Sequence, residues 1–393
     1  MKTDRKALEK NIGKIYWINL LESSGLHIVV FTLFLLSKGF SMKEFFIIES
    51  AFFLVALLME IPTGMFSDKV SRKWSLVISS LIGIPVTVVI ILSNSFYVVL
   101  IAMALGGVAG ALVSGTDIAI LYDTLKGLKK EDMFKKIGGK MRWYGGVSGA
   151  IGGIAGGMIA QFDLSYAWWG AVAVSVLSLF VRLSLKEPPF FRESEEESHL
   201  LHLGRSFKMS FKGDAAYFVL YAAITWLFFS LGFWLWQPYL KLISIPIFFF
   251  GFFYAAERLI SGYASKKAHQ VEGKIGMRNS LLFIPLILAL AFILQSQFVI
   301  LFGFLFIFLQ SVAGGYFGPV LDDYINKRIP SSKRATILSI KNMIYGLLFI
   351  IFSPLLGHVV DLYSLQIALL LMGAVLAVVA LIFFIVFKKR SKI

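Results

Sequence analysis

Residues 64–74, Gly-Met-Phe-Ser-Asp-Lys-Val-Ser-Arg-Lys-Trp, form a short charged turn between two long apolar runs. A turn this short ties two membrane helices closely together. Its Asp68 can meet the positive N-terminal end of a neighbouring helix, while its bases face the cytoplasm and lipid phosphates. The stretch therefore predicts a multi-pass helical membrane protein with a tight inner loop.

The composition agrees with this interpretation. Of 393 residues, 58% are hydrophobic and 15% aromatic, and the mean hydropathy is +0.80, which excludes an ordinary soluble domain. The net charge of +15 sits in loops, as expected of the cytoplasmic side of a membrane protein, so nucleic-acid binding is not predicted. The absence of cysteine excludes disulfides, thiol catalysis and Cys-ligated metal.

Apolar runs long enough to cross a bilayer predict twelve spans. Alternate connections carry most of the Lys and Arg residues, so both termini are predicted to be cytoplasmic in a cell membrane, with the first span retained rather than cleaved. The long polar segment 186–213 predicts a cytoplasmic linker between an N-terminal half, 1–185, and a C-terminal half, 214–393. The predicted spans are 12–36, 43–66, 74–93, 96–125, 137–161, 164–185, 214–240, 245–268, 279–297, 298–326, 334–360 and 364–387.

The two halves resemble each other in sequence. Segment 121–125 follows Gly115, and the similar segment 321–325 follows Gly315 at an offset of 200 residues. Tyr-Gly pairs also recur, at Tyr144 and Tyr345. These echoes predict a pseudo-symmetric duplication.

The charged turn resembles the loop 2–3 signature of the major facilitator superfamily, Gly-x-x-x-Asp-Arg/Lys-x-Gly-Arg-Arg/Lys. Ser71 stands where that family usually has glycine, and five residues match: Gly64, Asp68, Lys69, Arg72 and Lys73. The resemblance covers the whole chain. It implies an all-α integral membrane fold of twelve transmembrane helices in two pseudo-symmetric six-helix halves, which alternate access to a midplane cavity.

The fifth span resembles the helix-5 motif of proton-coupled drug exporters, Gly-x8-Gly-x3-Gly-Pro-x2-Gly-Gly. Four positions match, at Gly139, Gly152, Gly156 and Gly157, while Ser148 and Gly153 depart from the motif. The match favours export; close packing without gating is the alternative. Against the exporter branch, the fourth span has 103–107, Met-Ala-Leu-Gly-Gly, where such exporters carry Arg-x-x-Gln-Gly.

Ionisable groups inside a span are functional candidates because burying them is costly. In the first span, Asn19, Ser23 and His27 recur every four residues beside Glu22, so one polar stripe is predicted. Since helix 1 lines the cavity in the family that the chain resembles, we expect Glu22 to carry a proton or bind a cation, with His27 as partner. The alternative is that Glu22 only makes a structural hydrogen bond.

Other candidates fall into two groups. Asp117, Trp226 and Gln310 are deep enough in their spans to line the cavity, and Trp226 could stack an apolar or cationic ligand. The remaining charges lie at predicted inner ends, where ion pairs can form in one access state and break in the other. With the charged turn, this predicted gating set is Glu60, Gly64, Asp68, Lys69, Arg72, Lys73, Asp123, Glu257, Arg258, Asp322, Asp323 and Lys341.

The sequence therefore predicts a monomeric secondary transporter that exports a small, amphipathic solute against the proton gradient. A uniporter or metabolite importer of the same fold is the alternative. A membrane-embedded receptor or enzyme is disfavoured, because no Walker loop, His-Glu-x-x-His or Gly-x-Ser-x-Gly motif occurs. No cofactor or metal site is predicted; the expected partners are the solute, protons and the lipid bilayer.

Overall fold

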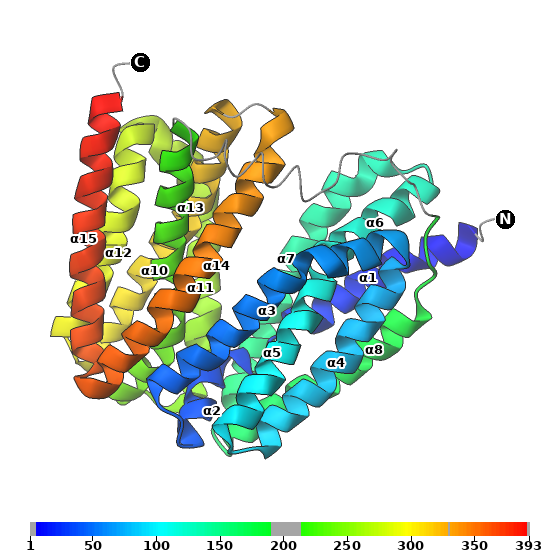
Figure 1. Cartoon of the computed structure of the whole chain (residues 1–393), viewed down its shortest axis with the longest axis horizontal. Helices are drawn as coiled ribbons and strands as arrows, with labels where there is room; N and C mark the ends of the chain where they lie inside the picture. The colour runs from blue at the N-terminus through cyan, green and yellow to red at the C-terminus, as the bar shows by residue number, and fades with distance from the viewer. Residues whose placement is uncertain (1–4, 190–213, 329–330, 391–393) are drawn as a thin grey trace. The chain divides into compact units, whose positions relative to one another are not determined.

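The computed structural model describes residues 5–189, 214–328 and 331–390, and every regular element in these ranges is helical (Figure 1). All twelve predicted spans appear there as helices. The long helices are α1 (Arg5–Ser23), α3 (Met42–Lys69), α4 (Arg72–Leu92), α5 (Phe96–Val113), α7 (Phe134–Ala160), α8 (Leu164–Ser184), α10 (Asp214–Leu242), α11 (Phe250–Ile275), α12 (Met277–Gln297), α13 (Phe304–Arg328), α14 (Ser331–Leu362) and α15 (Leu365–Arg390). Shorter elements are η1 (Ile28–Val30), α2 (Phe31–Ser37), α6 (Thr116–Gly127), η2 (Glu131–Met133), η3 (Ile247–Phe249) and η4 (Leu301–Gly303).

Ten helical segments of the described chain are long and apolar enough to cross a membrane by length and composition. The other two predicted spans correspond to α7 and α11. Repeated glycine lowers the hydropathy of α7, and α11 carries several Lys and Glu residues toward its C-terminal end. Both are nevertheless long helices, of 27 and 26 residues.

The chain divides into two compact units. The first comprises Met1–Phe40, Glu44–Ser194 and Pro246–Ala255; the second comprises Ser41–Lys43, Glu195–Ile245 and Ala256–Ile393. Most of the predicted linker, residues 190–213, lies outside the described residues, so the boundaries at 185 and 213 remain predictions. Lys186 is held by reciprocal bonds with Asn11, at 2.7 and 3.0 Å.

Two predicted spans in the first unit are interrupted. The first span breaks between Ser23 and Ile28, where Gly25 has φ +52°, and the fourth breaks at Gly115, where φ is +75°. Glycine adopts this left-handed conformation without the steric cost that a Cβ brings. The predicted spans 12–36 and 96–125 are thus each present, and each is divided into two helical parts.

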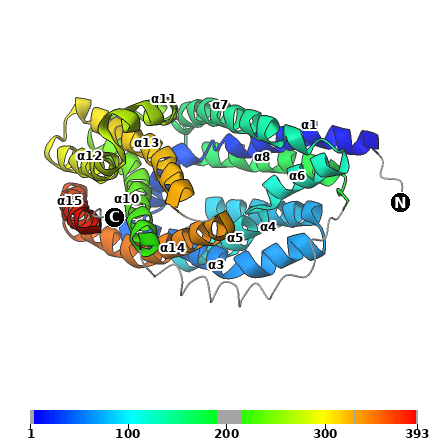
Figure 2. The same ribbon diagram turned by 90° about the horizontal axis from the view of Figure 1, so that it is seen from above.

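Helix α7 packs directly on the break in the first span, and α1, α7 and α8 lie side by side (Figure 2). A Cβ on Gly152 would lie 2.0 Å from the carbonyl oxygen of Ser24, and one on Gly156 would lie 2.0 Å from that of Leu26. The break also frees carbonyl groups that must find donors inside a membrane. Ser148 Oγ donates to Leu20 O at 2.6 Å, so this departure from the exporter motif supplies one such donor.

Helix α15 illustrates how both faces of a membrane helix are apolar. One face is buried against its own unit, and the other presents large exposed apolar side chains at helical spacing. The buried face neighbours α12 and α14. The exposed face is suited to contact with lipid. It contains Ile367, Leu370, Leu371, Val375, Val378, Leu381, Ile382 and Ile385.

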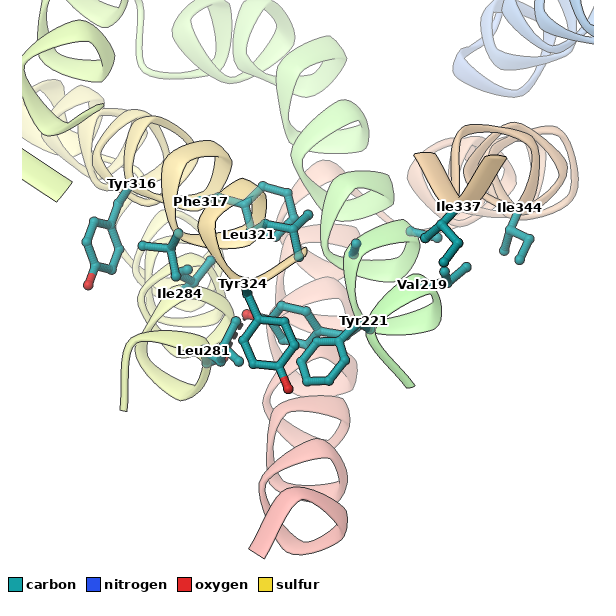
Figure 3. Close-up of a cluster of buried hydrophobic side chains, with 14 of the residues drawn as sticks. Val219, Tyr221, Leu281, Ile284, Tyr316, Phe317, Leu321, Tyr324, Ile337 and Ile344 are labelled. Carbon is teal, nitrogen blue, oxygen red and sulfur yellow. Dashed lines mark hydrogen bonds between the residues drawn. The ribbon is translucent and has the colours of Figure 1, made fainter. Parts of the chain in front are cut away.

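The core of the second unit is an aromatic and aliphatic cluster where α10, α12, α13 and α14 meet (Figure 3). Tyr324 lies against Phe218 with ring centroids 3.8 Å apart, and Tyr221 donates to Leu281 O at 2.7 Å. Ser280 and Tyr316 share a hydrogen bond of 2.6 Å. The polar ends of these aromatic residues are thus satisfied within the apolar core.

Candidate functional site

A buried ion pair joins α1 to α8 in the first unit. Arg182 Nη2 lies 3.1 Å from Glu22 Oε1, and the side chains are 4% and 42% exposed, respectively. The arginine is therefore enclosed by protein, while its carboxylate partner is open on one side.

The rest of the guanidinium is held by α4. Arg182 Nη1 donates to Leu76 O at 2.9 Å and to the hydroxyl oxygens of Ser79 and Ser80 at 2.8 and 2.7 Å. Its Nε is buried and has no partner among the described residues. A buried cation is stable only when it is paired and hydrogen-bonded, so removing Glu22 alone would be costly.

Asp117, a second predicted acid of this unit, occupies the first turn of α6, immediately after the break at Gly115. The Asp117 carboxylate accepts a hydrogen bond only from its neighbour Ile118, at 2.8 Å, among the interactions of the described chain. The described ion pair of this region is thus the one between Arg182 and Glu22, of which the sequence analysis identified the acid.

The predicted polar stripe in the first span is only partly correct. Asn19 and Ser23 both approach α7, where a Cβ on Gly145 would lie 3.2 and 2.9 Å from their side-chain oxygens. His27 lies beyond the helix break, and its ring is 4.8 Å from that of Trp168. No described hydrogen bond or ion pair joins His27 to Glu22, because the break ends the helical register that would have aligned them.

Two membrane-embedded charges were missed by the sequence analysis. Arg182 is the one cation within the 164–184 helix, which was itself a sufficient signal. Glu49, near the start of α3, is 4% exposed and makes no hydrogen bond or ion pair within the described residues. The sequence analysis did not single it out, although an acid inside an apolar span is itself a signal.

The charged turn forms a network at the α3–α4 connection. Arg72 Nε lies 2.7 Å from Asp123 Oδ2, and Arg72 Nη2 lies 3.6 Å from the exposed Asp68. Glu187 caps the N-terminus of α4, accepting from the amides of Arg72 and Lys73 at 2.9 and 3.0 Å and from the hydroxyl of Ser71 at 2.5 Å. Serine at 71 therefore serves as the N-cap, which explains why glycine is not needed there.

The other predicted gating residues of this unit are less constrained. Glu60 and Lys69 are exposed, Gly64 has open space around its Cα, and Lys73 lies 5.9 Å from the ring of Trp74. These positions give no described ion pair. Their gating role remains a prediction.

Among the predicted gating residues of the second unit, the described ion pair is a local one. Asp323 lies 2.6 Å from Lys327 one turn later, and the hydrogen bond to Asp323 raises the pKa of Lys327 above its usual range. The gating role of Glu257, Arg258, Asp322 and Lys341 remains a prediction.

Trp226 and Gln310, the predicted cavity residues of the second unit, lie on α10 and α13. Trp226 is 42% exposed and stacks on Phe317, with ring centroids 6.1 Å apart and an interplanar angle of 25°. Phe229 adds a second ring at 6.1 Å from Trp226. Gln310 is 8% exposed, and its Oε1 would lie 2.6 Å from a Cβ on Gly232. The accessible surface around Trp226 on α10 is therefore aromatic.

A family model described as Major Facilitator Superfamily matches residues 15–300 and 240–392. The chain belongs to this superfamily of transporters, and it is a multi-pass membrane protein. No curated protein matches it significantly.

Solved structures of transporters share the fold. A structure titled nucleoside transporter NupG aligns with a TM-score of 0.80 and 16% identity, covering 98% of this chain and 99% of that one. An inward-facing, unoccupied bacterial homologue of human lysosomal Spinster gives 0.72 and 16%, over 99% and 98%. A POT family transporter in complex with a thioalcohol-conjugated peptide gives 0.68 and 13%, over 97% and 96%. At these identities the likeness defines the fold alone.

Proposed function

We propose that this chain is a secondary active transporter that moves a small, amphipathic solute by alternating access, coupled to protons and working in export. The observation that carries the proposal is the ion pair between half-open Glu22 and enclosed Arg182. The glycine pattern of α7, similar to that of proton-coupled exporters, supports the direction. The working location is the cell membrane, with cytoplasmic termini and a monomeric protein.

The chemistry of the pair supplies a reason for coupling. When Glu22 takes a proton, its charge disappears and the attraction to Arg182 is lost. Because Arg182 is enclosed, leaving its charge without a partner is costly, so protonation of Glu22 changes the relative stability of arrangements with and without this contact. A proton can thereby bias a two-state equilibrium, as alternating access requires.

Within the second unit, the solute would meet an aromatic surface at Trp226 and Phe229, which suits an apolar or planar group, with Gln310 as a polar contact. Asp117 is a further polar candidate. Gate opening and closing would use the charged network around Arg72 and Asp123 together with the other predicted gating residues.

Uptake or uniport of a metabolite is the second candidate. Arg182 already neutralises Glu22, so a cationic drug would find no free carboxylate at that position. A neutral metabolite would not need one. Nucleosides enter the candidate list because one structural neighbour is titled a nucleoside transporter.

The test is solute flux in proteoliposomes with an imposed pH gradient, using a panel of lipophilic cations, organic anions, nucleosides, sugars and amino acids. Glu22→Gln is expected to abolish pH-driven accumulation while exchange of solute across the membrane persists. Asp163→Asn, which changes an exposed carboxylate capping α8, is the matched control and should transport normally.

Uphill transport that Glu22→Gln leaves undiminished would refute coupling through Glu22. Flux that dissipates a solute gradient but ignores the pH gradient would establish uniport instead. If the solute accumulated on the alkaline, inner side and protons moved with it in the same direction, the protein would be an importer.

A further inference from the structure

We infer that one surface of the first unit is a binding site for the headgroup of an anionic phospholipid. The surface lies where the start of α1, the start of α4 and the chain after α8 come together. We call it the lysine surface, and its four members are Lys10, Lys14, Lys73 and Lys186. Binding of a lipid there is independent of the proposed coupling and direction of transport.

A short segment at and after the end of α8 joins the three elements. Lys14 Nζ of α1 donates to Ser184 O, and the backbone of Lys186 exchanges two hydrogen bonds with α1, at 2.7 and 3.0 Å. On the other side of the segment, Glu187 accepts from the backbone amide of Lys73 at 3.0 Å. The lysine surface is therefore held in one place by hydrogen bonds between segments far apart in the chain.

The lysine surface carries more positive charge than the protein neutralises. Within the described residues, no ion pair involves any of its four lysines. The carboxylate of Glu187 caps α4, and Glu9 Oε1 lies 3.8 Å from Arg5 Nε and 3.5 Å from Lys130 Nζ. A lysine ammonium has three donors, and Lys14 uses one of them within the described chain. An anionic group from outside the protein can supply both the acceptors and the charge.

The spacing along α1 matches the layers of a membrane surface. Positions 10, 14 and 17 lie on one face of the helix, because they are four and three residues apart. At about 1.5 Å per residue, Lys10 and Lys14 are separated by roughly 6 Å along the axis, and Trp17 lies roughly 4.5 Å further on. The headgroup layer on each side of the hydrocarbon is roughly 5–7 Å thick. The two lysines can thus span that layer while Trp17 reaches the edge of the hydrocarbon.

Two exposed tryptophans beside the lysines favour a lipid over a soluble anion. Trp17 is 61% exposed and Trp74 is 49% exposed, and Lys73 Nζ lies 5.9 Å from the centre of the Trp74 ring. Indole rings are enriched at this level of a membrane because they combine an apolar body with a polar N–H group. A soluble phosphate would use the lysines alone. A phospholipid places its phosphate on the lysines and the upper part of its acyl chains on the indoles.

The test is tryptophan quenching in vesicles where phosphatidylglycerol replaces phosphatidylcholine stepwise, with the acyl chains of one lipid brominated at a time. Brominated phosphatidylglycerol is expected to quench more strongly than brominated phosphatidylcholine at the same fraction of the bilayer. Trp17→Phe should reduce that excess. Lys10→Gln should raise the phosphatidylglycerol fraction that gives half of the excess by about fivefold, the contribution of one lysine near an anionic surface.

Two triple variants, each lacking three lysines, separate a specific site from general attraction. The first removes most of the lysine surface and should abolish the excess: Lys10→Gln, Lys14→Gln and Lys73→Gln. The matched control removes three exposed lysines near the start of α7 and should keep the excess: Lys135→Gln, Lys136→Gln and Lys140→Gln. If the first variant does not fold, Lys10→Gln alone gives the answer, because its side chain is exposed and makes no hydrogen bond within the described residues.

Equal quenching by the two brominated lipids, or an excess that the first triple variant retains, would overturn the inference. An equal loss in the α7 control would also overturn it, because the attraction would then depend on net charge alone. If free glycerol phosphate raised the unfolding midpoint in phosphatidylcholine vesicles as much as phosphatidylglycerol does, the surface would bind a soluble anion and the lipid assignment would fail. None of these measurements requires transport, so a failed flux panel would leave the result intact.

Discussion

Replacing Gly152 by alanine tests how α7 is held against the break in the first span. The added Cβ would lie 2.0 Å from the carbonyl oxygen of Ser24, 2.6 Å from its carbonyl carbon and 2.8 Å from its Cα. Ordinary contact begins at 3.4 Å, and all three atoms are backbone. No side chain can turn aside, so α7 and the segment at Ser24 must separate by more than about 1 Å.

The expected cost has two parts. Overpacking of this kind destabilises by about 1–3 kcal/mol. Separation also stretches the bond from Ser148 to Leu20 O, which is worth about 1 kcal/mol. For a unit of 150–250 residues each kcal/mol moves the unfolding midpoint by about 2–4 °C, so Gly152→Ala is expected to lower it by roughly 5–15 °C.

Gly139→Ala on the same helix is the matched control. A Cβ there would meet nothing within 4 Å, and alanine favours a helix over glycine by up to about 1 kcal/mol. Its unfolding midpoint should stay level or rise slightly. The eight tryptophans allow unfolding to be followed by intrinsic fluorescence, whereas thiol-reactive dyes cannot report on a chain without cysteine.

If the Gly152→Ala variant were as stable as the unmodified protein, the close packing at Ser24 would be refuted. A loss in Gly139→Ala equal to that in Gly152→Ala would show that helix backbone effects, rather than this contact, dominate. Gly139→Ala that is stable but inactive in flux would instead support a gating role for the glycine pattern.

Three further predictions concern charges at helix ends. Asp123→Asn removes the carboxylate 2.7 Å from Arg72 and should lower the free energy of unfolding by about 1.5–3 kcal/mol. Asp68 lies 3.6 Å from Arg72 and is 65% exposed, so Asp68→Asn should cost under about 0.5 kcal/mol, yet slow turnover with little loss of binding. Equal stability losses in the two variants would contradict the geometry. The Lys38 ammonium, whose pKa is lowered by burial, donates to Ile91 O, Ser93 O and Asn94 Oδ1 at 2.8, 2.9 and 3.1 Å. Lys38→Met should therefore lower the free energy of unfolding by about 1–2 kcal/mol, measured from the shift in the unfolding midpoint. An unchanged midpoint would show that the end of α4 does not need this cap. Hydrogen bonds from the hydroxyl and then the amide of Ser165, the amide donating at 2.7 Å, lower the pKa of Asp163. The stabilisation by this cap should therefore be present above the unfolded pKa of about 4 and fade as pH falls through the lower folded pKa. Because Asp163 is exposed, the effect is small, and unfolding midpoints between about pH 3 and 6 should show a shallower acid slope in Asp163→Asn; identical slopes would exclude the cap as its source.

The membrane architecture was predictable because it depends on local composition. Each span is a run of apolar residues about as long as the bilayer is thick, and each basic loop is marked by its own residues. The same dependence on local composition explains why the interruption of the first span was not predicted. The break after Ser23 is packed against Gly152 and Gly156 of α7, and the hydropathy of residues 12–36 gives no indication of this contact.

The candidate site was predictable only in its parts. Glu22 and Asp117 stand out as acids in apolar spans, and Arg182 could have been found by the same criterion. The pairing of Glu22 with Arg182 could not, because it requires α1 and α8 to meet, from positions 160 residues apart. Likewise Asp123 was grouped with Arg72 as a gate residue, whereas the cap that Glu187 provides to α4 is visible only when the end of α8 returns to it.

A multi-pass helical membrane protein with the motif of its superfamily could be recognised from the residues alone, because hydrophobicity and charge act residue by residue at the membrane. Which intramembrane charges pair, and which helix is interrupted, depends on tertiary packing. Those outcomes depend on close contact between segments far apart in the chain. At Gly152 the carbonyl oxygen of Ser24 leaves no room for a Cβ, and at Arg182 the carboxylate of Glu22 supplies the counter-ion.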